Sequence, residues 1–293
     1  MIRIGIVGAE NSHSAAIART LNIDKSVPGF RAVAIWGETD EFAAKSAEAG
    51  RIPAIVKQPA DMIGKIDAVI VDHRHAKYHL EAAEPFLTAR MPMFIDKPFC
   101  YRLADGKRFL ERATKAGVPV TSFSTVPLQK CSREYAKAIR KAKVVSVASA
   151  GPCDLDSKYG GVFFYGIHQV DMLLECFGTD VVRTAVSRSP GSPNASATMW
   201  WTSGMVGTVQ CLNDQLSRNS GMQFLAVTDS GPLAVKVQYD ANIYLTGIKT
   251  FCRMFKTGKE PFEHRRFLAS IAVLEAMEKS VNAGGQVQEV EKV

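Results

Sequence analysis

The first 121 residues alternate short apolar strands with amphipathic helical segments, and this alternation constrains the fold more than any other feature of the chain. Apolar, β-branched runs at Ile2–Val7, Phe30–Trp36 and Ala68–Val71 are each followed by a helical pattern. Strands that alternate with helices form parallel sheets through right-handed crossovers. The pattern therefore predicts an α/β fold that begins with a doubly wound parallel sheet, with helices on both faces.

The alternation changes from about Ser122, where several strand-like runs follow one another without a helix between them. A tight hairpin is predicted at Trp201–Met205, and a closing helix at Arg266–Asn282. We expect a domain over residues 1–121 and a second α/β (α+β) domain over 122–293, which carries a large, mostly antiparallel open sheet. The predicted strands of this second part are 144–150, 181–187, 196–202, 206–212, 224–228 and 233–238.

Charge and cysteine usage exclude several functional classes. The formal charge of +7 comes from scattered basic residues without aromatic interleaving, which indicates a solvated surface and no nucleic-acid partner. The six cysteines stand singly and form neither a disulfide framework nor a zinc motif. No apolar run approaches the roughly 20 residues of a membrane span. We expect a cytoplasmic protein with reduced thiols and no membrane partner.

The turn after the first strand reads Gly8-Ala9-Glu10-Asn11-Ser12-His13. A dinucleotide fold places the pyrophosphate here, at the N-terminus of the first helix. Gly8 supplies the first glycine of the usual G-x-G-x-x-G pattern, but Glu10 and His13 replace the other two. Asn11, Ser12 and His13 can cap the helix and donate to phosphate, and the Glu10 side chain can turn toward a ribose. The alternative is a capped loop without a ligand.

An acidic residue just beyond the second strand bears on the choice of cofactor. Glu38 stands there and is expected to accept a hydrogen bond from the adenosine ribose. Its negative charge would repel a 2′-phosphate. The sequence therefore favours NAD over NADP, although both remain open.

Two further segments carry candidate catalytic residues at positions that the predicted fold defines. Lys97 lies between Asp96 and Pro98 at the end of a strand, at the carboxyl edge where open α/β sheets bind ligands. His168 and Asp171 share one face of a helix, and its other face is apolar. A histidine near a helix start, with a carboxylate one turn away to orient its ring, is a candidate proton carrier.

The loop after the third strand contains Asp72, His73 and His79, which we expect to border the cofactor and the substrate. His75 and His79 would share a helical face and could ligate a metal together with Asp72. Arg74 and Lys77 lie between them and would repel a cation. No metal is therefore expected.

Taken together, these motifs resemble the Gfo/Idh/MocA oxidoreductase family, the relatives of glucose-fructose oxidoreductase and inositol dehydrogenase. The resemblance rests on Asp96-Lys97-Pro98 in place of the usual Glu-Lys-Pro, on Gly160-Gly161 followed by His168, and on Ser203-Gly204. It implies a Rossmann domain followed by an open-sheet domain and an NAD(P) cofactor. It also implies sugar, inositol or polyol substrates, or their oxidised forms, and a homodimer or homotetramer formed through the C-terminal sheet.

By position, the resemblance implies that Lys97 contacts the nicotinamide ribose and the substrate hydroxyl, and that His168 is the catalytic histidine. Asp171 matches the acid that follows it, Gly8 the first turn glycine, and His79 lies at or near the histidine usually found after the third strand, where we expect it to bind a substrate hydroxyl. The family's aspartate four positions before the catalytic histidine is Phe164 here, so the adjacent Tyr165 is expected to replace it partly, in catalysis and in substrate binding.

The predicted reaction is hydride transfer at a CH–OH group, with His168 as acid/base and Lys97 stabilising the developing alkoxide. Two alternatives remain open. One is a dinucleotide- or sugar-binding regulator without turnover, since fold does not determine function. The other is a lyase or epimerase that uses the cofactor transiently, which would need the same lysine and histidine.

Overall fold

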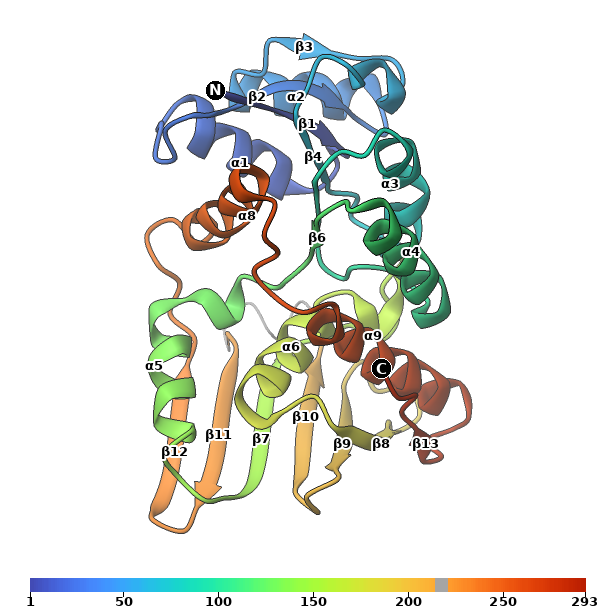
Figure 1. Cartoon of the computed structure of the whole chain (residues 1–293). Helices are drawn as coiled ribbons and strands as arrows, with labels where there is room; N and C mark the ends of the chain where they lie inside the picture. Colours follow the sequence, from blue (N-terminus) through green and yellow to red (C-terminus); the bar gives the residue numbers. More distant parts are fainter. Residues whose placement is uncertain (214–220) are drawn as a thin grey trace. The chain divides into compact units, whose positions relative to one another are not determined.

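The computed structural model describes residues 1–213 and 221–293, and the chain forms two compact units (Figure 1). The unit changes between Phe123 and Ser124, close to the boundary expected at 121/122. The segment Tyr244–His264 belongs to the first unit, whereas the sequence analysis placed it in the second. The first unit consists of Met1–Cys100, Ala104–Phe123 and Tyr244–His264, and the second of Tyr101–Leu103, Ser124–Ile243 and Arg265–Val293.

The first unit is built on a six-stranded, fully parallel sheet with the order β3-β2-β1-β4-β5-β6. The predicted doubly wound sheet is thereby confirmed. All four residues of β4 are buried, as expected for a strand covered on both faces. The strands are β1 Ile2–Val7, β2 Phe30–Trp36, β3 Ala54–Ile55, β4 Ala68–Val71, β5 Met93–Ile95 and β6 Val120–Thr121.

Helices cover both faces of this sheet, with α3 and α4 on one side and α1 and α8 on the other (Figure 1). The helices are α1 Ser12–Asn22, α2 Asp40–Gly50, α3 His79–Thr88, α4 Leu103–Ala116 and α8 Leu245–Thr257, with 3-10 turns η1 Pro59–Met62 and η2 Ala76–Tyr78.

Helix α8 joins the first unit through aromatic packing. Phe251 stacks on Phe94 of β5, with ring centroids 4.6 Å apart, and Phe123 packs on the same Phe94 ring at 5.0 Å. Phe251 is fully buried. The amphipathic pattern of α8 shows that one of its faces is apolar, but it does not identify the sheet that this face covers.

The second unit is built on a seven-stranded sheet with the order β12-β11-β7-β10-β9-β8-β13, in which only the β7–β10 pair is parallel among the described strands. The predicted hairpin joins β9 to β10, with the Trp201 amide donating to the Met205 carbonyl at 3.0 Å. The strands are β7 Val144–Pro152, β8 Val181–Ser187, β9 Ala195–Trp201, β10 Val206–Leu212, β11 Gln223–Thr228, β12 Gly231–Lys236 and β13 Gln288–Glu289.

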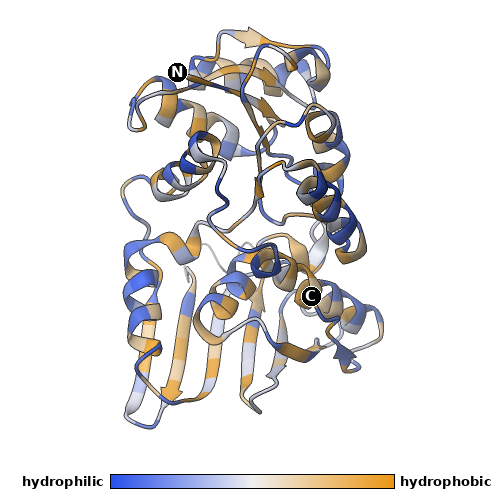
Figure 2. Ribbon diagram, viewed as in Figure 1, coloured by the Kyte–Doolittle hydropathy of each residue, from blue (hydrophilic) through white to orange (hydrophobic). Residues whose placement is uncertain are grey.

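One face of this sheet carries the helices and the other remains open. Buried and more exposed residues alternate along β9, β10 and β11. Figure 2 shows the hydropathy of the residues along these strands. The open face includes Val206, Leu225 and Val227, which are 36%, 39% and 43% exposed. The helices of this unit are α5 Lys130–Ile139, α6 Gly166–Phe177 and α9 His264–Asn282, whose first residue lies in the first unit, with 3-10 turns η3 Val126–Leu128 and η4 Gly161–Phe163.

All six cysteines are free thiols. In the described parts of the chain, no helix combines the length and the apolar character needed to cross a membrane.

Candidate functional site

The turn between β1 and α1 requires a glycine at its start. Gly8 has a φ of +110°, and a Cβ at this position would lie 2.6 Å from the carbonyl carbon of Asp72. The turn therefore packs directly against the chain leaving β4. Asn11 caps α1 by accepting a hydrogen bond from the His13 amide at 3.4 Å. Ser12 follows as the first residue of the helix.

A carboxylate of the chain itself occupies two donors of this turn. One oxygen of Glu38, Oε2, accepts hydrogen bonds from the backbone amides of Ala9 at 2.8 Å and Glu10 at 2.9 Å. The other oxygen, Oε1, is buried and has no hydrogen-bond partner among the described residues. A buried acceptor without a donor is unfavourable by itself and would suit a ligand hydroxyl. Glu38 thus lies at the turn, near the position expected from the sequence.

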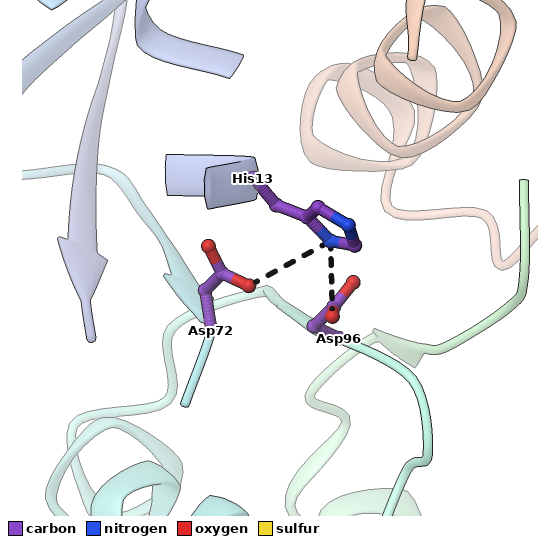
Figure 3. A group of neighbouring side chains, drawn as sticks. All are labelled: His13, Asp72 and Asp96. Atoms are coloured by element: carbon purple, nitrogen blue, oxygen red, sulfur yellow. Dashed lines mark hydrogen bonds and ion pairs between the residues drawn. The ribbon is translucent and has the colours of Figure 1, made fainter. Parts of the chain in front are cut away.

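Two carboxylates and an imidazole meet at the carboxyl ends of β4 and β5 (Figure 3), and the Asn11 amide contacts both carboxylates. The Asn11 amide nitrogen donates to Asp72 at 2.8 Å and to Asp96 at 3.3 Å. The Nδ1 atom of His13 lies 3.1 Å from Asp96 Oδ2 and 3.9 Å from Asp72 Oδ1. The ring of His13 also packs on Tyr244, with centroids 4.9 Å apart. His13 therefore connects the start of α1 to the carboxyl groups of Asp72 and Asp96.

The pKa values of the two carboxyl groups are shifted in opposite directions. Burial raises the pKa of Asp72 well above its ordinary value, and the neighbouring Asp96 charge raises it further. Burial also acts to raise the pKa of Asp96, but attraction to His13 and Lys97 outweighs it and leaves this pKa below its ordinary value. Asp72 therefore keeps its proton to a higher pH than Asp96 does.

His13, Asp72 and Asp96 offer ligand atoms that all lie within 4.8 Å of one another, as a divalent cation would require. The Asn11 amide already donates to both carboxylates. The Lys97 ammonium lies 3.9 Å from Asp96. Donors of the chain thus balance this charge, and we assign the cluster to the organisation of the turn. Within the described ranges, His75 and His79 are not part of this cluster.

Lys97 is held beside the cluster at the end of β5. Its side chain is only 11% exposed, and the Lys97–Pro98 peptide bond is cis. The fully buried His79 lies next to this segment: its Nδ1 is 2.8 Å from the Pro98 carbonyl oxygen and its Nε2 is 2.8 Å from that of His73. Burial lowers the pKa of His79. The ring thus ties the Lys97 segment to the loop after β4, whereas the sequence analysis expected it to contact substrate.

A cavity of about 450 Å³ opens beside the loop after β4. Three aromatic rings form part of its wall: the ring centroid of His73 is 5.7 Å from that of Trp36 and 5.9 Å from that of Tyr78. Burial, together with a smaller effect of the nearby His79, lowers the pKa of His73 to about 3. His73 is therefore neutral, and its buried Nδ1 has no partner among the described residues. Trp36 and Tyr78 were not recognisable as site residues from the sequence, because they belong to no motif.

The second unit holds the other predicted site residues. His168 and Asp171 lie on α6, and both are buried. The Nδ1 atom of His168 lies 2.7 Å from the hydroxyl oxygen of Ser124. Asp171 accepts a hydrogen bond from the backbone amide of Ser124 at 3.1 Å. Asp171 therefore reaches His168 through Ser124, whereas the sequence analysis expected it to orient the ring directly.

Further donors fix Asp171. Its Oδ1 accepts hydrogen bonds from the Arg266 guanidinium and, at 3.2 Å, from the Ser270 hydroxyl. Tyr165 precedes α6 with a φ of +64°, and its ring centroid is 5.7 Å from that of His168. Ser124, Arg266 and Ser270 are the residues of this group that sequence reasoning missed, since a loop serine and single polar residues on a helix carry no spacing signal.

The first unit thus gathers most of its predicted site residues around the carboxyl ends of β1, β4 and β5, and the second unit gathers its own set at the start of α6. The first set is Gly8, Glu10, Asn11, Ser12, His13, Glu38, Asp72, His73, His79 and Lys97, and the second is Tyr165, His168 and Asp171.

Residues 2–124 match the GFO_IDH_MocA model, described as an oxidoreductase family with an NAD-binding Rossmann fold. Comparison with curated proteins gives no sequence match.

Solved structures share the fold of the whole chain at low sequence identity. Myo-inositol 2-dehydrogenase of Lactobacillus plantarum is 14% identical, with a TM-score of 0.84 and 99% of each chain covered. Myo-inositol dehydrogenase of Lactobacillus casei, solved with NAD(H) and myo-inositol, is 14% identical, with a TM-score of 0.83, and the match covers 100% of this chain and 98% of that one. An oxidoreductase of Agrobacterium radiobacter, solved with NAD+, L-tartaric acid and magnesium, is 14% identical, with a TM-score of 0.81 and coverages of 99% and 98%.

Proposed function

We propose that this chain, whose residues 2–124 match the Gfo/Idh/MocA oxidoreductase family, binds NAD on its first unit and transfers hydride between the nicotinamide and a CH–OH carbon of a carbohydrate-like substrate. The observation that carries this proposal is the anchored Glu38 carboxylate. One of its oxygens holds the β1–α1 turn, and the other is buried without a donor.

The residues present fit a dinucleotide. Glu38 Oε1 would accept a ribose hydroxyl, and the aromatic cavity with Trp36, His73 and Tyr78 would take a flat base such as adenine. The Glu38 charge would repel a 2′-phosphate, so we propose NAD as the cofactor in preference to NADP. When bound, NAD supplies the hydride acceptor.

The chain's own residues would handle the proton and the charge. Lys97 would stabilise negative charge on the substrate oxygen and contact the nicotinamide ribose. His168 would bind the substrate oxygen and exchange its proton. Tyr165 would bind a second substrate hydroxyl, and Asp171 would act through Ser124. His79 would position the Lys97 segment, to which its ring nitrogen is hydrogen-bonded.

The substrate class we propose is a polyol, an inositol, a sugar or a sugar acid. Support comes from relatives of the same fold that were solved with myo-inositol or L-tartaric acid, both of which carry adjacent hydroxyl groups on carbon.

The test begins with calorimetric titration of the purified protein with NADH and, separately, NADPH. We expect saturable binding that favours NADH. Polyols and sugar acids are then screened with NAD by absorbance at 340 nm. Absence of binding by folded protein would refute the proposal. Binding without turnover would favour a regulator, and a product without net NADH would favour the transient use of the cofactor in a lyase or an epimerase.

Lys97→Ala is the variant to be tested in this screen. We expect turnover to fall by about 10²-fold or more with the fold retained, because a charge that stabilises the transition state is lost. Lys249→Ala, a change at an exposed position on α8, serves as the control. Wild-type turnover in the Lys97 variant would remove this residue from the reaction.

A further inference from the structure

Ser124 makes three hydrogen bonds from a fully buried position between β6 and η3. Its backbone amide donates to Asp171 at 3.1 Å. Its hydroxyl oxygen accepts the backbone amide of Val126 at 3.1 Å and lies 2.7 Å from Nδ1 of His168. The backbone contact fixes the residue, and the side chain reaches the imidazole.

Counting protons shows whether the Ser124 hydroxyl donates or accepts in its hydrogen bond with His168. A serine hydroxyl has one proton and two lone pairs, and the Val126 amide uses one lone pair. Within the described parts of the chain, the only acceptor in reach of the Ser124 proton is His168 Nδ1. If Nδ1 carried a proton instead, the buried hydroxyl proton would have no acceptor, which is unfavourable.

We infer that Ser124 is a positioning residue that selects the tautomer of His168, so that the neutral ring carries its proton on Nε2. This inference rests on the proposed role of His168 in the reaction. In this tautomer, the ring would meet a substrate oxygen as an N–H donor. Accepting a proton from an alcohol at Nε2 would first require the proton to move to Nδ1 and the Ser124 hydroxyl to rotate.

The selection also depends on Asp171. Its Oδ2 holds the Ser124 amide, while its Oδ1 is held by Arg266 and by Ser270. Ser270 contacts Asp171 but is not hydrogen-bonded to His168. It therefore offers a control position, because its loss disturbs the same carboxylate without removing the donor to the imidazole.

The first test is long-range ¹H–¹⁵N NMR of ¹⁵N-histidine-labelled protein, with the pH raised until the His168 signals stop changing. The His168 signals are assigned by their loss in His168→Gln. We expect a protonated Nε2 and a bare, hydrogen-bonded Nδ1. A proton on Nδ1 would overturn the inference.

Variants then test the source of the preference. In Ser124→Ala, the Nδ1 resonance should move to the position of a nitrogen without a hydrogen bond, while Ser124→Thr and Ser270→Ala should retain the wild-type position. An unchanged Nδ1 resonance in Ser124→Ala would overturn the inference. If Ser124→Ala does not fold, as judged by circular dichroism, the wild-type tautomer and Ser124→Thr decide the question.

The NMR readout does not depend on turnover, so the two proposals can fail separately. A protein with the expected tautomer but no NAD binding would refute the proposed function alone. In an active protein, Ser124→Ala should lower kcat by about tenfold in the reductive direction, in which His168 donates its Nε2 proton to the substrate oxygen. This is the effect of one lost hydrogen bond, and the affinity for NADH should be unchanged. Wild-type kcat in this variant would overturn the role of Ser124 in the reaction.

Discussion

Glu38 holds the β1–α1 turn with one carboxylate oxygen, and we propose that the other oxygen binds a ribose hydroxyl. Its position after the second strand predicts a contact with ribose, and the unpaired Oε1 agrees with that role. Its hold on the Ala9 and Glu10 amides was not predictable, because a contact between residues 28 or 29 positions apart leaves no local pattern. Ser124 was missed for the same reason: a single loop serine carries no period, and only the fold brings it to His168.

Glu38→Gln tests the carboxylate directly. The amide keeps the size of the side chain but loses the charge, so we expect NADH to bind about tenfold more weakly, the cost of a charge-assisted hydrogen bond of about 1.5 kcal/mol. The preference over NADPH should shrink as well, since the repulsion of a 2′-phosphate is removed. Calorimetry checks both effects, with the exposed Glu41→Gln as control. Unchanged affinities in Glu38→Gln would argue against the ribose contact.

The raised pKa of Asp72 predicts the direction in which the free energy of unfolding changes with pH. Its pKa is raised in the folded state, so the native protein binds more protons than the unfolded chain above pH 3.8, and Asp72 destabilises the fold as the pH rises through that window. The slope from one proton is at most about 1.4 kcal/mol per pH unit. Asp72→Asn should flatten the curve.

Guanidinium unfolding between about pH 4 and pH 7 measures this slope in wild type, Asp72→Asn and the control Asp40→Asn, which changes an exposed carboxylate on α2. Equal slopes in wild type and Asp72→Asn would show that the Asp72 carboxyl is ionised across the window.

At the scale of elements, the strands of the first sheet were predictable because buried parallel strands read as β-branched apolar runs. The hairpin at Trp201–Met205 was predictable from its turn residues. Helix α8 was different: its amphipathic period was readable, but its partner was not. Stacking of Phe251 on Phe94 depends on two residues more than 150 positions apart in the chain.

Phe251→Ala measures what α8 contributes. Removing a fully buried ring that stacks on β5 should lower the free energy of unfolding by about 3–5 kcal/mol. Lys249→Ala, at an exposed position on the same helix, should change it by less than about 0.5 kcal/mol. Denaturant unfolding monitored by fluorescence gives both values. Similar, small losses in the two variants would show that α8 does not complete the core of the first unit.

At the scale of the whole molecule, the open face of the second sheet is the surface we propose for self-association. Val206, Leu225 and Val227 lie there on neighbouring or nearby strands and remain 36–43% exposed. Flat sheet faces with exposed apolar side chains are suited to a second copy, because the same surface pairs with itself around a two-fold axis.

Leu225→Lys tests this surface. Introducing a charge at the centre of a self-paired apolar face places like charges opposite one another, so we expect the assembly to dissociate toward monomers. Light scattering coupled to size-exclusion chromatography reports the mass of wild type and variant. The control is Val145→Lys. Val145 is 59% exposed, but it lies on the face of β7 opposite the open face. A monomeric wild type would refute the assembly.

The return of residues 244–264 to the first unit has a consequence for how the protein is made. Phe94 and Phe123 leave the ribosome long before Phe251, so the nascent first unit waits with its aromatic surface uncovered while the entire second sheet is synthesised. Folding of the first unit therefore cannot finish in the order of translation. A fragment that stops at residue 123 should therefore aggregate and be short-lived. Adding the missing helix α8 afterwards should allow this fragment to complete its fold.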